Sequence, residues 1–186
     1  MDRNAQTVPY GFRAKENGAQ AARGTLIYYD AFAQEDEAAL GEALDQAAAL
    51  ARRRTFAKLV LYPLHEETIK RMQGRGSSVA PYYKREERLF EWRHERGEGL
   101  ATVETWEGKR KKYTPMEAAL RHLADTYAAP LFLLLSPDNA NAFASYASFD
   151  EWIAKLRLVL TEPPASIHPK LERHRSRWDV ADAEEE

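Results

Sequence analysis

Asp30 and His65 are the residues whose types and positions best suit acid–base chemistry. Asp30 follows an apolar run at residues 25–29, and His65 follows a second apolar run that stops at Pro63. A histidine exchanges a proton near neutral pH, and a neighbouring carboxylate can hold one tautomer of its imidazole. The two residues therefore predict an acid–base or ligand-orienting pair. A helix cap at Asp30 and a surface histidine at the start of a helix are the other interpretation of the same positions.

A run of four cations, Lys109, Arg110, Lys111 and Lys112, is the best candidate for binding phosphate. It lies just before Thr114, where the sequence predicts the start of a helix. Helix N-termini attract anions through their free N–H groups, and nearby lysine and arginine side chains add positive charge. The run therefore indicates contacts to a phosphate, a nucleotide or an RNA backbone. A solvated basic loop is the alternative.

Ser136 and Asp138 complete the set of candidate ligand-binding residues. They follow the apolar run at residues 131–135, with Pro137 between them. Ligands of open parallel sheets bind outside the carboxyl ends of the strands, so both residues are expected near Asp30 and His65. A serine followed by proline is also a common start of a helix, in which case Ser136 serves as an N-cap.

Several familiar catalytic motifs are missing from the sequence. Residues 74–78 have neither the Walker lysine nor the spacing of a dinucleotide-binding loop, and there is no G-x-S-x-G motif. His168 and His174 lack carboxylates at metal-binding spacing, so no metal site is expected. The chain contains no cysteine, which excludes thiol nucleophiles and disulfides. The sequence thus identifies no cofactor and does not decide whether the protein is an enzyme.

The elements that must position these residues alternate between strand and helix. Residues 25–29 and 56–62 are rich in apolar, β-branched and aromatic side chains, as buried strands are. Residues 35–54 between them begin with acids and end with arginines, the order that a helix dipole favours. Strand, helix and strand in this order predict a parallel β-α-β unit. Residues 131–135 have no polar member, which predicts an interior strand covered on both faces.

Two further helices are predicted from their first residues. Thr114 and Glu117 have the spacing of a capping box, so a helix is expected from residue 115 to about residue 128. Ser148 and Glu151 have the same spacing, and the apolar residues that follow at helical intervals predict a helix that continues to residue 160. Residues 158–160 taken alone also fit a strand.

Residues 84–113 fit two different structures. The apolar and polar residues alternate over 89–94 and again over 100–106, with a glycine-containing turn at 97–99 between them. This pattern is typical of a β-hairpin. Residues 84–93 fit a helix equally well.

Together these patterns predict a single α/β domain with a largely parallel sheet, helices on both faces and an antiparallel hairpin insertion around residues 88–108. The domain is expected to span residues 24–165. Residues 1–23 have no periodic pattern and predict an irregular lead-in, and residues 166–186 predict a charged tail that is disordered from residue 180 onward.

Composition narrows the classes of function. The chain has 186 residues, with 27 Lys and Arg, 29 Asp and Glu, and a formal net charge of −2. A net charge this close to zero disfavours nucleic acid as a partner. Residues 82–96 nevertheless interleave cations and aromatic rings as RNA-binding surfaces do. No apolar stretch is long enough for a membrane helix or a signal peptide. A cytoplasmic protein without a membrane partner is therefore expected.

Three functions remain. The first is binding or turnover of a nucleotide or phosphorylated small molecule at the carboxyl edge of the sheet, with Asp30 and His65 as catalytic residues. The second is a regulatory or assembly protein that acts through a protein partner. The third is an RNA-binding protein that uses its basic segments.

Overall fold

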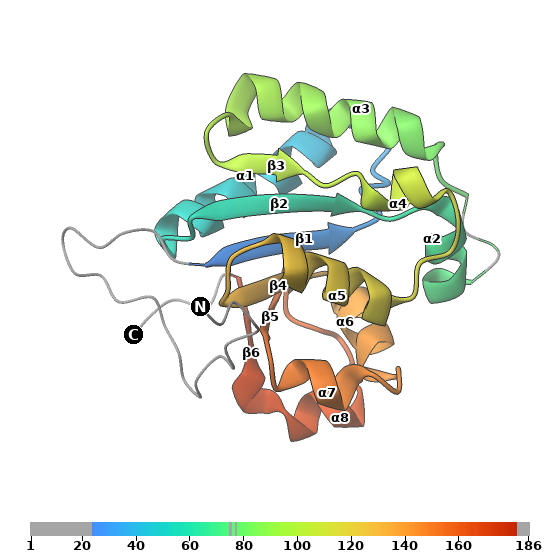
Figure 1. Cartoon of the computed structure of the whole chain (residues 1–186), viewed down its shortest axis with the longest axis vertical. Coiled ribbons are helices and arrows are strands. Elements are labelled where there is room, and N and C mark those ends of the chain that lie inside the picture. The colour runs from blue at the N-terminus through green and yellow to red at the C-terminus, as the bar shows by residue number, and fades with distance from the viewer. Residues whose placement is uncertain (1–23, 75, 77, 182–186) are drawn as a thin grey trace.

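A computed structural model describes residues 24–74, 76 and 78–181. Its centre is a sheet of six parallel strands in the order β3-β2-β1-β4-β5-β6. Figure 1 shows this order from β3 near the top to β6 near the bottom. The strands are β1 (Thr25–Asp30), β2 (Lys58–Pro63), β3 (Ala101–Val103), β4 (Leu131–Leu135), β5 (Arg157–Leu160) and β6 (Trp178–Val180). The predicted α/β domain with a parallel sheet is confirmed.

The central strands are apolar on both sides because helices cover both faces of the sheet. Ile27 of β1 is in register with Val60 of β2 on one side and with Leu133 of β4 on the other. All five residues of β4 are buried, which confirms the predicted interior strand. A continuous apolar run is the usual sequence of a strand in such a position.

Two groups of helices form the outer layers. The helices are α1 (Glu37–Arg53), α2 (Glu66–Gln73), α3 (Tyr82–Trp92), α4 (Trp106–Arg110), α5 (Met116–Thr126), α6 (Pro137–Ala144), α7 (Phe149–Ile153) and α8 (Pro169–Arg173). The apolar side chains of α1 and α3 pack on one face of the sheet, which we call the α1 face. Those of α2, α5, α6, α7 and α8 pack on the opposite face.

Helix α1 begins and ends as its sequence predicts. The side chain of Asp36 accepts a hydrogen bond from the backbone N–H of Ala38 and caps the first turn. Arg52 and Arg53 lie in the last turn, near the negative end of the helix dipole. Leu40 and Leu44 are buried against the sheet. The helix therefore lies with one fixed side toward β1 and its neighbours.

The strand order reverses between β1 and β4. The chain moves outward from β1 to β2 and β3, and then crosses back to place β4 on the other side of β1. The loops that leave β1 and β4 consequently diverge, because the helices that follow, α1 and α6, pack on opposite faces of the sheet. This topological switch point is where open parallel sheets bind their ligands.

The expected hairpin insertion is not present. Residues 82–92 form α3, residues Arg93–Gly97 form one turn of π-helix, and β3 joins the edge of the sheet parallel to β2. Arg85, Leu89 and Trp92 of α3 are buried at helical spacing, and their packing outweighs the alternating pattern. Gly97 is required here because a Cβ at this position would lie 2.6 Å from the Trp92 ring.

The predicted helix over residues 148–160 is wrong in its second half. Helix α7 ends at Ile153, and Arg157–Leu160 pair with β4 as strand β5. Pairing with a neighbouring strand depends on residues far away in the sequence, and here it overrides the helical spacing. The side chain of Ser148 makes no capping hydrogen bond.

The two other predicted caps have different outcomes. Ser136 accepts a hydrogen bond from the N–H of Asn139 at 3.2 Å, which confirms it as the N-cap of α6. The predicted capping role of Thr114 is wrong, because Pro115 occupies the N-cap position of α5. The Thr114 hydroxyl is buried and donates instead to the carbonyl oxygen of Lys112.

The C-terminal segment differs from the predicted charged tail. Helix α8 is followed by a short 3-10 turn and by β6, which adds the sixth strand to the sheet. Trp178 of β6 is 2% exposed, and its indole N–H donates to the Leu171 carbonyl. The predicted lead-in at residues 1–23 and the end of the tail at residues 182–186 lie outside the described residues. Within the described ranges, every helix is too short or too polar to cross a membrane.

Candidate functional site

A pocket of about 400 Å³ lies at the switch point, between α1 and the carboxyl ends of β1, β4 and β5. Tyr28 and Leu134 place it on the α1 face of the sheet. Its polar lining consists of Tyr28, Asp30, Gln34, Gln46, Arg53, Ser136, Thr161 and Glu162. The volume falls within the range of small-molecule binding sites. We call this cavity the switch-point pocket.

Asp30 is the residue of this pocket with the clearest acid–base character. It ends β1, and its side chain lies on the α1 face together with that of Tyr28. Burial raises the pKa of Asp30 to about 6, and hydrogen bonds from the backbone of Phe32 and Ala31 and the charge of Arg85 limit this increase. A carboxyl group with this pKa can exchange a proton at physiological pH.

The turn after β1 fixes the Asp30 carboxylate. Its Oδ2 accepts a hydrogen bond of 2.8 Å from the N–H of Phe32, the pattern of an Asx-turn. Phe32 has φ of 53°, in the left-handed region that residues other than glycine rarely adopt. Its ring is completely buried, and this packing holds the unfavourable backbone in place. Backbone strain of this kind is concentrated at functional sites.

A buried arginine, Arg85 of α3, ties this turn to the rest of the sheet edge. Its Nη1 donates to the carbonyl oxygens of Ala31 and Leu64, each at 2.7 Å. Its Nε donates to Ala80, and its Nη2 forms an ion pair with Glu66 at 2.8 Å. Burial lowers the pKa of the guanidinium, and Glu66 opposes this effect. One side chain thus holds the loops that leave β1 and β2 in a fixed relation.

The start of α6 contributes the other side of the pocket. Ser136 lines the pocket and caps the helix, while Asp138 is exposed at the same edge and is not a lining residue. Asn139 is 1% exposed, and its Nδ2 donates to Oδ1 of Asp30 at 3.5 Å. The ends of β1 and β4 are therefore linked by a direct side-chain contact.

Three more polar groups face the same space from β1, the following loop and the end of β5. The Tyr28 hydroxyl has a raised pKa because it is buried and lies near the negative charges of Asp30 and Glu162. Thr161 is held at the end of β5 by a hydrogen bond from its N–H to the Leu135 carbonyl. Oε1 of Gln34 is shielded from solvent and has no hydrogen-bond donor among the described residues. A ligand in the pocket would meet hydroxyl, amide and carboxylate groups.

The structure does not bring His65 into this pocket. His65 is the N-cap of α2, where its Nδ1 accepts from the N–H of Glu67 at 3.2 Å. Its own N–H donates to the buried carboxylate of Glu107, and its ring stacks near that of Tyr82. Each polar contact of His65 within the described residues serves the local structure, and Asp30 is not among its partners.

The basic run also lies apart from the pocket. Lys109 and Arg110 end α4, and Lys111 and Lys112 follow in an exposed turn. Helix α4 is anchored through Glu107, which accepts a hydrogen bond of 2.8 Å from Thr68 of α2.

Helix α2 packs on the face opposite α1, and so does the partly buried ring of Trp106 in α4. The four cations follow β3, the edge strand beyond β2, and none of them lines the switch-point pocket.

Sequence reasoning identified Asp30 and Ser136 but missed several residues of the site. Thr161 and Glu162 follow β5, and they would have been candidates if residues 158–160 had been interpreted as a strand. Gln34 lies in the loop after the first strand, a signal that was available. No sequence signal pointed to Arg85, because a buried arginine in a run of charged residues cannot be distinguished by sequence from a solvated one.

The described residues contain no group of three or more His, Asp or Glu side chains placed to hold a metal ion.

No protein-family profile and no curated protein matches this chain. The site must accordingly be interpreted from its own chemistry.

Proposed function

We propose that this protein binds a small polyhydroxylated molecule, of the kind represented by the ribose of a nucleoside, in the switch-point pocket. The observation that carries the proposal is the position of Asp30, a carboxylate with a pKa of about 6 at the end of a central strand and on the wall of the pocket. In dinucleotide-binding sheets a carboxylate about 20 residues beyond the first strand accepts a hydrogen bond from a ribose hydroxyl, and Asp30 presents the same chemical group to this pocket from the end of β1.

The charges of the pocket favour a ligand without a phosphate. Asp30 and Glu162 are two carboxylates, and Arg53 is the one cation among the described lining residues. Arg53 already donates to the Ala181 carbonyl at 2.9 Å. The start of α1 also carries acids, Asp36 and Glu37, which oppose an anion at that helix N-terminus. Hydroxyl groups, which donate to carboxylates, fit this lining better than phosphate oxygens.

Asp30 has two roles in this proposal. In its ionised form it accepts a hydrogen bond from a ligand hydroxyl and orients the ligand. With a pKa of about 6 it is also able to take up the proton of such a group during a reaction. Ser136, Thr161 and Gln34 supply further hydrogen bonds, and the ring of Tyr28 forms part of the wall.

A thermal-shift panel tests this proposal. Adenosine, cytidine, ribose and the corresponding 5′-monophosphates are added to the protein at neutral pH, and the melting temperature is measured. A ligand that binds only the folded state raises it by mass action. We expect the nucleosides to raise the melting temperature, and the monophosphates to give no larger shift.

Variants show which site causes the ligand-induced shift in melting temperature. Asp30→Asn and Thr161→Val should each weaken binding, Asp30→Asn by about tenfold or more, equivalent to about 1.4 kcal/mol. Asp138→Asn is the matched control, since it removes an acid from the same edge but outside the pocket, and it should bind as the parent does.

A shift caused by phosphorylated compounds alone and lost in the double variant Lys109→Glu with Lys111→Glu would move the site to the basic run. No shift with any compound would reject the proposal in favour of a protein that acts through a protein partner.

A further inference from the structure

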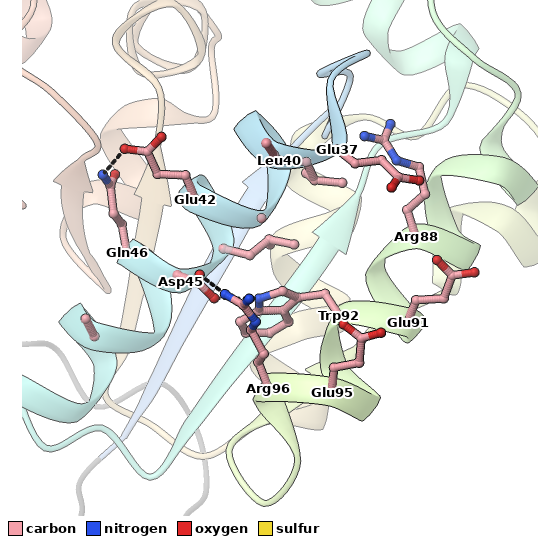
Figure 2. Close-up of a pocket in the computed structure, with 14 residues that line it drawn as sticks. Glu37, Leu40, Glu42, Asp45, Gln46, Arg88, Glu91, Trp92, Glu95 and Arg96 are labelled. Atoms are coloured by element: carbon pink, nitrogen blue, oxygen red, sulfur yellow. Dashed lines mark hydrogen bonds and ion pairs between the residues drawn. The ribbon is translucent and has the colours of Figure 1, made fainter.

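A second cavity lies on the other side of α1, between that helix and α3. It has a volume of about 610 Å³ and is lined by residues of α1, α3 and the following π-helical turn. Figure 2 shows the side chains of the two helices facing each other across it. We call it the α1–α3 groove. It shares Gln46 and Ala49 with the switch-point pocket, so α1 forms the wall between the two.

The groove carries an excess of negative charge. Its lining includes five carboxylates, Glu37, Glu42, Asp45, Glu91 and Glu95, and two guanidinium groups, those of Arg88 and Arg96. Asp45 is occupied, because it accepts a hydrogen bond from the Trp92 indole at 2.9 Å and forms an ion pair with Arg96. The other four carboxylates belong to exposed residues and outnumber Arg88. The excess of carboxylates gives the groove a negative potential, which favours a cationic ligand.

The floor of the groove is apolar. Leu40 and Leu44 of α1 and Trp92 of α3 line it, and these side chains also belong to the core on the α1 face. An apolar floor between two acidic walls suits a ligand that carries both aliphatic and cationic groups.

A glycine in the middle of α1 leaves part of the groove open. Gly41 lies on the groove, and nothing comes within 4 Å of the position that a Cβ atom would occupy there. A glycine inside a helix costs about 1 kcal/mol relative to alanine. No neighbour among the described residues requires this glycine, and the helix backbone at Gly41 is open to the groove.

Arg88 indicates what kind of cationic ligand the groove takes. Arg88 is a partly exposed residue of the groove lining, and its guanidinium carries only hydrogen-bond donors. A polyamine brings only donors and offers this group no acceptor, whereas a peptide brings backbone carbonyl oxygens. The groove walls run along α1 from Glu37 to Ala49, which is roughly 18 Å at 1.5 Å per residue.

We propose that the α1–α3 groove binds a basic, partly apolar peptide segment of a partner protein. Lysine or arginine side chains of the segment pair with the carboxylates of α1 and α3, its aliphatic side chains cover Trp92, and its backbone passes over Gly41 and reaches Arg88. This inference is independent of the switch-point pocket, because the charged residues that carry it line only the groove.

Fluorescence anisotropy with synthetic peptides tests the proposal. The probe is a labelled extended peptide of about 6 residues, a length that matches the groove at roughly 3.3 Å per residue, built from leucine, alanine and lysine. A second peptide has glutamate in place of each lysine. We expect the lysine peptide to bind, the glutamate peptide not to bind, and the affinity to fall as salt is added.

Variants place the peptide in the groove. Glu91→Gln with Glu95→Gln should weaken binding by about tenfold or more, and Gly41→Leu should abolish it by filling the open space. Gly41→Leu replaces glycine by a good helix former where no atom is close, so its unchanged or higher melting temperature shows that it folds. Glu151→Gln with Glu172→Gln removes two exposed acids from the other face of the sheet and should bind as the parent does.

Five outcomes would overturn the proposal. Equal binding of both peptides, or no binding of the lysine peptide, would show that the groove does not select a basic segment. Equal loss in the control variant would show non-specific charge attraction. Binding of spermine without binding of the peptide would assign the groove to a polyamine. A dimer that is lost in the Glu91→Gln with Glu95→Gln variant would assign it to a second copy of the chain.

Discussion

Nδ2 of Asn139 donates a hydrogen bond to Oδ1 of Asp30 across 3.5 Å. The two residues follow β4 and end β1, the strands between which the sheet order reverses. This contact joins the two strand ends beside the switch-point pocket. It lies where the loops diverge, and the buried amide of Asn139 in α6 contacts the Asp30 carboxylate from the side of the neighbouring strand β4.

The pH dependence of stability should report on Asp30. Its pKa is about 6 in the folded protein and near 4 in an unfolded chain, so the folded state binds the proton more tightly. Protonation therefore stabilises the fold, and this stabilisation is lost as the pH rises from about 4 to about 6.

We expect Asp30→Asn to stabilise the protein by about 2 kcal/mol at neutral pH, a value below the full shift because the side chain keeps some contact with solvent. The measurement is chemical denaturation at several pH values. Asp138→Asn serves as the control. A parent and an Asp30→Asn variant whose stabilities differ by the same amount at every pH would contradict the assignment of a raised pKa to Asp30.

Arg85 should be essential for the arrangement of the sheet edge. Arg85→Met leaves the Ala31 and Leu64 carbonyls without their shared donor and Glu66 without its partner. Loss of one partner of a buried ion pair costs about 3 kcal/mol or more. Arg121→Met is the matched control, since Arg121 pairs with Glu117 on the exposed surface, where such pairs contribute about 0.5 kcal/mol. Equal unfolding midpoints for the two variants would show that Arg85 does not hold the loops.

The caps of α6 and α7 give a matched pair of serines. Ser136→Ala should lower the free energy of unfolding by about 1 kcal/mol, because the N–H of Asn139 loses its acceptor. Ser148→Ala should leave it nearly unchanged, since the Ser148 side chain makes no capping hydrogen bond. Urea denaturation of both variants measures the difference. A larger effect at Ser148 than at Ser136 would contradict the described helix starts.

Three local signals in the sequence were informative, whereas the capping boxes at Thr114 and Ser148 were not. The apolar run of β4, the cap at Ser136 and the charge order of α1 each depend on residues within a few positions, and the structure confirms all three. Strand β5 was misread because its state is decided by pairing with β4, and the hairpin was misread because the buried face of α3 is defined by the sheet below it.

The candidate site was predictable only in part for the same reason. Asp30 and Ser136 were expected to lie together because parallel strands bring their carboxyl ends to one edge, and both line the switch-point pocket. His65 and Lys109 follow β2 and β3, which lie on the side of β1 away from β4, and neither residue lines the pocket. The order of the strands depends on pairing between distant segments, a property that no short segment encodes.

Mapping the bound nucleoside by NMR tests the central claim most directly. Adenosine is titrated into isotopically labelled protein, and the backbone amide shifts are followed. We predict saturable shifts at Asp30, Gln34 and Thr161, no shifts at Lys109 to Lys112, and weaker binding as the pH is lowered through about 6, where Asp30 becomes protonated. Shifts confined to the basic run, or no shifts under saturating adenosine, would contradict a hydroxyl-binding site at the switch point.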